Sequence, residues 1–205
     1  QIIDAGRAVD PAALVRVSEL YDEAPMVTEF CALAGQGVDI DVNDGDVPRR
    51  FTVPATLEEA LTAKAARPAA RLLCGGTDLG VQRNHGRVAL ADVICLNQVP
   101  ELQGSRIEGE LLVLGAAATW REVELGMREL LPEFAQILAR FGSPQIRQLA
   151  TVGGNVANAS PIADSLPLFF VLEATVRVAS TRGVRDVPME KFYLGYKKLD
   201  LQPDE

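Results

Sequence analysis

Residues 71–80 read RLLCGGTDLG, an apolar run that ends in two adjacent glycines. The run predicts a short buried strand, and the glycines let the main chain approach a ligand closely because no Cβ intervenes. Successive N–H groups at such a turn can form a nest for a phosphate oxygen, and Thr77 adds a hydroxyl donor. The stretch is neither a P-loop nor a dinucleotide-binding G-x-G-x-x-G. A tight turn between a strand and a helix is the alternative interpretation.

The elements around this stretch predict a small parallel α/β unit. Residues 51–54 and 91–96 are further strand candidates, and Thr56 with Glu59 forms a capping box that opens a helix. Pro68 lies just beyond the end of that helix. Strand, helix, strand, loop and strand at this spacing are typical of a parallel sheet.

The chain after residue 104 predicts an α+β unit. Residues 106–115 indicate a hairpin, and residues 174–187 alternate as a second antiparallel pair around Arg182 and Gly183. Helices are expected between these pairs, and they begin at Thr119, at Pro132, and at Asp164 or Ser165. We therefore predict an α+β fold of two subdomains, residues 49–103 and residues 104–205.

A second glycine-rich stretch, residues 151–164, reads TVGGNVANASPIAD. Its uncharged hydrogen-bonding side chains are Thr151, Asn155, Asn158 and Ser160. A packing seam of small residues is the alternative interpretation. Two such stretches, one in each half, suggest a dinucleotide held through main-chain N–H groups, since neither contains Lys or Arg. Asp78 and Asp164 would then point away from the phosphates, toward sugar-type hydroxyls.

The composition excludes several classes of function. The chain has 205 residues, a net charge of −8 and a pI near 4.8, which disfavours nucleic acid and anionic membranes as partners. The single histidine, His85, rules out multi-histidine metal sites, and the three cysteines form no C-x-x-C pair. With no signal peptide and no apolar span, we expect a cytoplasmic protein without a metal site.

The segment before residue 49 shows weak periodicity. Residues 39–46, DIDVNDGD, resemble a calcium loop faintly, but Asp44 stands where such a loop needs glycine, and its twelfth position is Arg50. We interpret residues 39–46 as a solvated linker and residues 12–21 as a short helix.

These segments together resemble the flavin-binding portion of xanthine dehydrogenases, of the molybdenum hydroxylase family, and are most similar to the bacterial small subunit. The motifs that carry the likeness are CGGTDL at 74–79, SPQIR at 143–147, ATVGGN at 150–155, ASPIAD at 159–164 and FYLGYKK at 192–198. The resemblance covers the chain from Phe51 onward, and residues 2–5 look like the join after the family's iron–sulfur domain.

The resemblance implies a fold of the PCMH/CO dehydrogenase flavoprotein type: a small α/β subdomain, a second subdomain with an antiparallel sheet and helices, and FAD between them. Around the pyrophosphate and ribityl chain it places Leu72, Leu73, Cys74, Gly75, Gly76, Thr77, Asp78 and Leu79. Against the dinucleotide from the other side it places Thr151, Gly153, Gly154, Asn155 and Asn158, although some relatives have threonine in place of Asn158. Asp164 would accept a hydrogen bond from a sugar-type hydroxyl. Phe141 falls near the flavin, with core packing as its alternative role.

The resemblance also implies an electron-transfer role with no catalytic residue in this chain. In the family, electrons pass from a molybdopterin cofactor through two [2Fe–2S] clusters to FAD and then to NAD. Expected partners are therefore NAD, an iron–sulfur domain and a molybdopterin-binding subunit, with residues 1–48 as the linker after that domain. A further C-terminal subdomain of the family would follow Glu205. The alternatives are a flavin subunit for carbon monoxide, an aldehyde or a heteroaromatic acid, and a non-catalytic scaffold.

Overall fold

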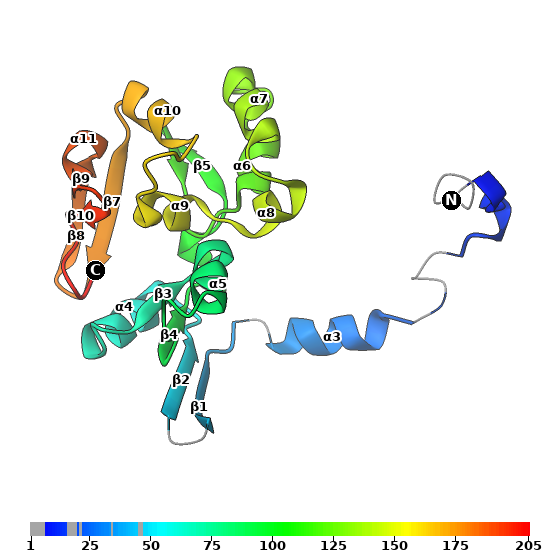
Figure 1. Ribbon diagram of the computed structural model, residues 1–205, viewed down its shortest axis with the longest axis horizontal. Coiled ribbons are helices and arrows are strands. Elements are labelled where there is room, and N and C mark those ends of the chain that lie inside the picture. Colours follow the sequence, from blue (N-terminus) through cyan, green and yellow to red (C-terminus); the bar gives the residue numbers. More distant parts are fainter. Residues whose placement is uncertain (1–6, 16–19, 21, 34, 45–46) are drawn as a thin grey trace. The chain divides into compact units, whose positions relative to one another are not determined.

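The computed structural model describes residues 7–15, 20, 22–33, 35–44 and 47–205, and the chain divides into two compact units (Figure 1). The first unit, residues 1–34, contains a 3-10 turn η1 (Pro11–Ala13) and helix α3 (Ala24–Leu33). Of the helix expected over residues 12–21, residues 16–19 and 21 lie outside the described residues, and residues 12–13 belong to η1. The second unit, residues 35–205, carries every residue assigned to the candidate site.

A four-stranded sheet forms the first half of the second unit. Its strands are β1 (Val38–Asp44), β2 (Val47–Val53), β3 (Arg71–Leu73) and β4 (Asp92–Cys95), in the order β1-β2-β4-β3. β4 pairs in parallel with β2 and with β3, which confirms the predicted parallel α/β unit. Three helical segments connect these strands to one another and to the second half: α4 (Leu57–Ala66), α5 (Thr77–Asn84) and the 3-10 turn η2 (Pro100–Leu102).

The interpretation of residues 39–46 as a solvated linker is wrong for the described part of that segment. Residues 38–44 form strand β1, which pairs antiparallel with β2. The acidic side chains are compatible with a strand because basic and hydroxyl groups face them across the ladder. Asp39 accepts hydrogen bonds from Arg50 and Thr52, and these bonds lower the pKa of Asp39 to about 2.

Both predicted capping boxes mark the start of a helix. The capping box at the start of α6 is complete. The Glu122 main-chain N–H donates to the Thr119 hydroxyl, and the Glu122 carboxylate accepts from the Thr119 N–H at 2.7 Å. At the start of α4, the Thr56 hydroxyl accepts from the Glu59 N–H as expected. The Glu59 carboxylate, however, accepts from the N–H of Ala55 at 2.7 Å, one residue earlier than the box predicts.

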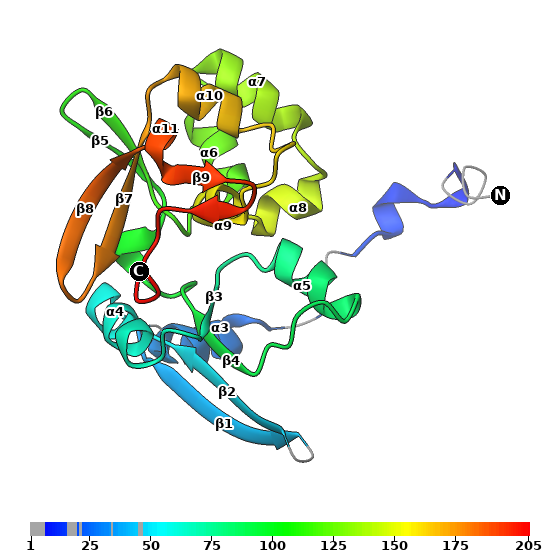
Figure 2. The ribbon, with the colours of Figure 1, turned by 60° about the vertical axis from the view of Figure 1, so that its left-hand side comes forward.

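The second half combines helices with three antiparallel pairs of strands (Figure 2). The pairs are β5 (Ser105–Glu108) with β6 (Leu111–Leu114), β7 (Thr175–Ser180) with β8 (Gly183–Pro188), and β9 (Tyr193–Gly195) with β10 (Lys198–Leu199). The helices are α6 (Trp120–Gly126), α7 (Pro132–Arg140), α8 (Pro144–Leu149), α9 (Val152–Asn158), α10 (Leu166–Val171) and α11 (Met189–Phe192). Both predicted hairpins and the α+β character are confirmed. Within the described ranges, no helix is both long enough and apolar enough to cross a bilayer.

An aromatic cluster fills the core of this half. Trp120 is fully buried, and its ring lies 5.4 Å from that of Phe141, 6.2 Å from that of Phe169 and 6.4 Å from that of Phe134. The rings come from α6, from α7 and the residue that caps it, and from α10, so their contacts fix these helices against one another. Helix α9, which carries the first half of the second glycine stretch, packs on this core through Val152 and Val156.

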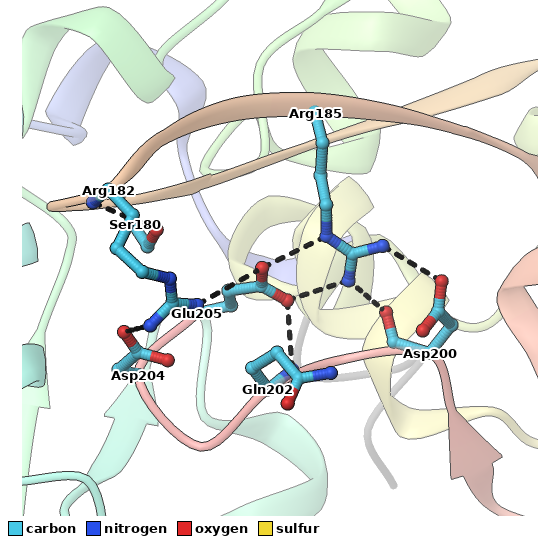
Figure 3. A network of polar contacts seen from close by, with 7 residues as sticks. All are labelled: Ser180, Arg182, Arg185, Asp200, Gln202, Asp204 and Glu205. Carbon is cyan, nitrogen blue, oxygen red and sulfur yellow. Dashed lines mark hydrogen bonds and ion pairs between the residues drawn. The ribbon is translucent and has the colours of Figure 1, made fainter.

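A network of charges ties residues 200–205 to hairpin β7–β8 (Figure 3). The Arg185 guanidinium donates to the carboxylates of Glu205 and Asp200, at 2.9 Å and 2.8 Å, and to the Asp200 carbonyl at 2.7 Å. Arg182 pairs with Asp204 in the same network. The side chain of Glu205 is only 5% exposed, so it depends on these cations for charge compensation.

Candidate functional site

The first glycine stretch ends strand β3 and opens helix α5. Gly76 is the N-cap residue and has φ +69°, a conformation that favours glycine. Among the described residues, no main-chain N–H from Cys74 through Leu79 donates to a protein acceptor. β3 lies at the edge of the sheet and the first turn of a helix leaves its N–H groups unpaired, which together account for this run of free donors. Unpaired N–H groups in such a run are able to donate to an anionic group.

The two glycine stretches meet at Gly75. A Cβ on that residue would lie 2.0 Å from the carbonyl oxygen of Leu149 and 2.9 Å from the Cα of Ala150. Beside this contact, the Cys74 thiol is hydrogen-bonded with the side chain of Thr151, and burial raises the pKa of the thiol to about 11. Gly75 is therefore required for the approach of two protein segments, in addition to any approach of a ligand.

The second glycine stretch folds differently from the expectation. The sequence predicted no helix between Phe141 and Asp164, but the first half of this stretch is helix α9 with Thr151 as N-cap. Every N–H at the start of this helix has a protein acceptor. Val152 donates to Ala118 (2.9 Å), Gly153 to Ala116 (2.8 Å), Gly154 to the Thr151 hydroxyl (3.3 Å) and Asn155 to the Thr151 carbonyl (3.0 Å). At residues 152–155 the main-chain N–H groups are therefore paired inside the protein and are not free donors for a diphosphate, in contrast to those of residues 74–79.

Tight packing explains why these donors are used internally. Residues 150–152 pair with residues 118–120 through an antiparallel bridge between Thr119 and Thr151. A Cβ on Gly153 would lie 2.7 Å from the Cβ of Ala116, so this glycine serves close packing. Gly154 is exposed, and a Cβ there would meet the Thr151 hydroxyl alone. Of the two glycines, Gly154 is the more exposed.

The side chains of the second stretch remain able to bind a ligand. The Asn155 carbonyl oxygen accepts from the Ser165 hydroxyl at 2.5 Å, which leaves the Asn155 NH₂ group to donate. Asn158 is half-buried and its carbonyl oxygen faces the Lys197 ammonium at 3.5 Å. Asp164 is exposed and makes no hydrogen bond or ion pair within residues 47–205. The second stretch thus offers amide donors and one carboxylate acceptor.

Comparison with known proteins identifies the family. Residues 47–205 match the family described as the FAD binding domain in molybdopterin dehydrogenase. The chain belongs to this family. It is 34% identical over 154 residues to the xanthine dehydrogenase FAD-binding subunit of Escherichia coli O157:H7, and 33% identical over 164 residues to xanthine dehydrogenase 1 of Arabidopsis thaliana. These alignments cover 74% of this chain, 53% of the bacterial subunit and 12% of the plant protein.

Solved structures agree with this assignment. Carbon monoxide dehydrogenase from Hydrogenophaga pseudoflava superposes with a TM-score of 0.71 at 27% identity, covering 75% of this chain and 55% of that one. Quinoline 2-oxidoreductase from Pseudomonas putida 86 superposes with a TM-score of 0.70 at 28% identity, covering 74% and 54%. The chain is thus an FAD-binding domain of an oxidoreductase family, and it spans about half the length of the bacterial relative and of these structures.

The other residues assigned to the FAD-binding domain are spread between site and core. Phe141 is 9% exposed and packs on Trp120, so the structure favours its alternative role in the core. Asp78 accepts a hydrogen bond from Gln82 one turn along α5, which turns its carboxylate toward its own helix. Leu72 is exposed on the edge strand. Leu73 is half-buried, and a Cβ added to Gly76 would lie 3.0 Å from its Cδ1 atom.

Two residues beside the second stretch were missed by the sequence reasoning. Lys197 brings a cation next to Asn158 and has φ +51°, a strained conformation for lysine. The Tyr193 hydroxyl donates to the Val156 carbonyl at 2.9 Å and so braces α9, while burial raises the pKa of Tyr193 to about 12. Both belong to the motif FYLGYKK at 192–198, which resembles the xanthine dehydrogenase family but from which the sequence predicted no binding residue.

Hollows elsewhere on the surface do not include the glycine stretches. One of about 600 Å³ lies between hairpin β5–β6 and the end of α6, and one of about 430 Å³ lies beside the end of α5. Neither hollow is lined by residues 74–79 or 151–164.

Proposed function

We propose that this FAD-binding domain holds FAD against its first glycine stretch and relays electrons to NAD in a xanthine dehydrogenase. The observation that carries the proposal is the uninterrupted series of free N–H groups from Cys74 through Leu79. Free donors suit the pyrophosphate of a dinucleotide, and N–H dipoles can bind it although the chain carries a net charge of −8. The residues of the first stretch therefore fit the cofactor that defines the family.

The assignments for the second stretch change with the geometry. Because the main-chain donors at the start of α9 are occupied, the NH₂ groups of Asn155 and Asn158 would contact the dinucleotide, and Asp164 would accept from a sugar-type hydroxyl. Thr151 acts as the cap of α9 and as the partner of Cys74, and Gly153 acts in packing. Bound FAD supplies the redox chemistry, while the protein holds and orients the cofactor.

The proposal extends to a larger assembly. Electrons would arrive from [2Fe–2S] clusters on an iron–sulfur domain, supplied in turn by a molybdopterin-binding subunit during oxidation of hypoxanthine or xanthine in the cytoplasm. The names of the bacterial and plant relatives support xanthine dehydrogenase. The boundaries proposed for the two subdomains, residues 49–103 and 104–205, remain our division of the compact unit.

A second candidate is the flavin subunit of a related molybdenum hydroxylase. The structures of carbon monoxide dehydrogenase and quinoline 2-oxidoreductase, which superpose about equally well, favour it. The flavin domain does not choose the substrate of such an assembly. Assay of the complete complex with hypoxanthine and NAD separates the candidates: turnover supports xanthine dehydrogenase, and turnover of only carbon monoxide, an aldehyde or a heteroaromatic acid contradicts it.

Titration of the purified protein with FAD tests the binding itself. We expect flavin fluorescence to change on binding, and a visible flavin spectrum to remain with the protein after dialysis. Gly154→Leu places a bulky side chain over the exposed face of α9, where the main neighbour is the Thr151 hydroxyl, and we expect FAD to be lost with the fold retained. If the complete complex carrying this variant transferred electrons to NAD at the wild-type rate, a scaffold role for this domain would be favoured. Gly80→Ala, at a site with nothing within 4 Å, is the matched control.

A further inference from the structure

A buried ion pair joins α6 to α8. The Arg147 Nε lies 3.2 Å from a carboxylate oxygen of Glu124, and the two side chains are 9% and 4% exposed. Replacing a buried ion pair by apolar residues of similar size often leaves stability unchanged or improved, because desolvation offsets the attraction. Stability alone is therefore a poor explanation for this pair, and its geometry points to another task.

Arg147 also fastens the end of a third helix. Its Nη1 donates to the carbonyl of Phe141 at 2.8 Å and lies 3.4 Å from that of Gly142. These carbonyls belong to the turn that ends α7, where Gly142 has φ +52°. One guanidinium thus connects the carboxylate of α6, the end of α7 and its own helix, and a lysine at this position has no planar fork to reach both partners.

The helix that carries Arg147 ends at the contact between the two glycine stretches. α8 finishes at Leu149, whose carbonyl oxygen faces Gly75. The next carbonyl, that of Ala150, accepts from the N–H of Trp120 at 3.0 Å. Trp120 and Glu124 lie one turn apart on α6, so that helix holds the segment before Thr151 at two points.

We propose that Arg147 is a positioning residue for FAD binding: anchored by Glu124 and the end of α7, it sets where Leu149 meets Gly75 and therefore how the two glycine stretches are spaced. The inference rests on the proposed function, because it assumes that both stretches contact the same dinucleotide. It assigns a positioning role to Arg147 and Glu124, whose side chains are both buried.

The surroundings of Glu124 provide matched controls. Arg121 donates to both oxygens of this carboxylate at 2.8 Å, and Arg128 lies 3.4 Å from one of them. Both are more exposed than Arg147, at 37% and 59% of the side chain, and neither contacts the end of α7. Burial opposes ionisation, but the hydrogen bonds from Arg121 and Arg128 and the charge of Arg147 hold the pKa of Glu124 below its ordinary value.

The test compares Arg147→Met and Arg147→Lys with Arg128→Met, using FAD affinity from flavin fluorescence and the unfolding midpoint of the apoprotein. A misplacement of about 1 Å at a site can cost about 100-fold. We expect FAD to bind about 10-fold to 100-fold more weakly to both Arg147 variants, and within about twofold of wild type to Arg128→Met. Equal losses in Arg128→Met and Arg147→Lys overturn the inference, since any change around Glu124 would then suffice.

A double-mutant cycle with Gly75→Ala distinguishes positioning from general destabilisation. If Arg147 acts through the contact at Gly75, then Arg147→Lys costs much less FAD affinity in the Gly75→Ala background than in wild type. The inference is overturned if the fold-loss of FAD affinity in the double variant equals the product of the two single losses. Wild-type FAD affinity in Arg147→Met also overturns it. Wild-type protein that binds no FAD contradicts the proposed function instead, so the two failures are distinguishable. Where Arg147→Met does not fold, the lysine variant and the cycle carry the test.

Discussion

The two glycine stretches look alike in sequence and differ in what their main chains do. In residues 74–79 the N–H donors are free, whereas at the start of α9 every donor has a protein acceptor. Each stretch uses one glycine for close packing: Gly75 against Leu149, and Gly153 against Ala116. A glycine pair therefore does not by itself indicate a phosphate site. What indicates it is the state of the neighbouring N–H groups, because a donor already paired inside the protein cannot also bind a ligand strongly.

The largest effect is expected from adding one carbon at the contact between the stretches. Gly75→Ala places a Cβ 2.0 Å from the Leu149 carbonyl oxygen, and main-chain atoms there cannot rotate away. We expect FAD affinity to fall by about 100-fold and the free energy of unfolding to fall by about 1–3 kcal/mol. Fluorescence titration and urea denaturation measure the two losses. Wild-type behaviour on both would show that the stretches do not need this contact.

A smaller effect is expected from charge in the second stretch. Asn155→Asp keeps an acceptor for the Ser165 hydroxyl but replaces an NH₂ donor by a negative charge. We expect FAD to bind about tenfold more weakly, a loss of about 1.4 kcal/mol, with the unfolding midpoint nearly unchanged. Repeating the titration at 50 mM and 500 mM salt checks the cause, because screening should reduce the difference between variant and wild type. Equal affinity at low salt would place the diphosphate away from Asn155.

The smallest effects come from the two threonines, and they should differ in kind. Thr151→Val removes the cap that accepts from Gly154, so we expect about 1 kcal/mol of stability to be lost. The Thr77 hydroxyl makes no hydrogen bond or ion pair within residues 47–205, so Thr77→Val should leave stability within about 0.5 kcal/mol of wild type. Its cost should appear in FAD affinity instead. Thermal unfolding of the apoproteins beside FAD titration separates these outcomes, and a destabilised Thr77→Val would contradict the comparison.

Local signals account for what could be predicted about the fold. The capping residue Thr119 is followed at once by its helix, and the alternation of residues 174–187 is the pattern of a two-stranded pair. Local signals misled where a distant partner decides the structure. Residues 39–44 are acidic enough for a loop, but Arg50 and Thr52 on the neighbouring strand make them a strand.

By itself, the sequence determined the parallel unit, the α+β second half, the position of both glycine stretches and the likeness to a flavin-binding family. Only the tertiary structure decided which stretch keeps its donors free, that Phe141 packs in the core, and that Arg147 connects three helices. The physical reason is range along the chain. Caps and periodicity act within a few residues, whereas the acceptor for Gly153 lies at Ala116 and the partner of Gly75 lies at Leu149, contacts that form only when segments distant in the sequence fold together.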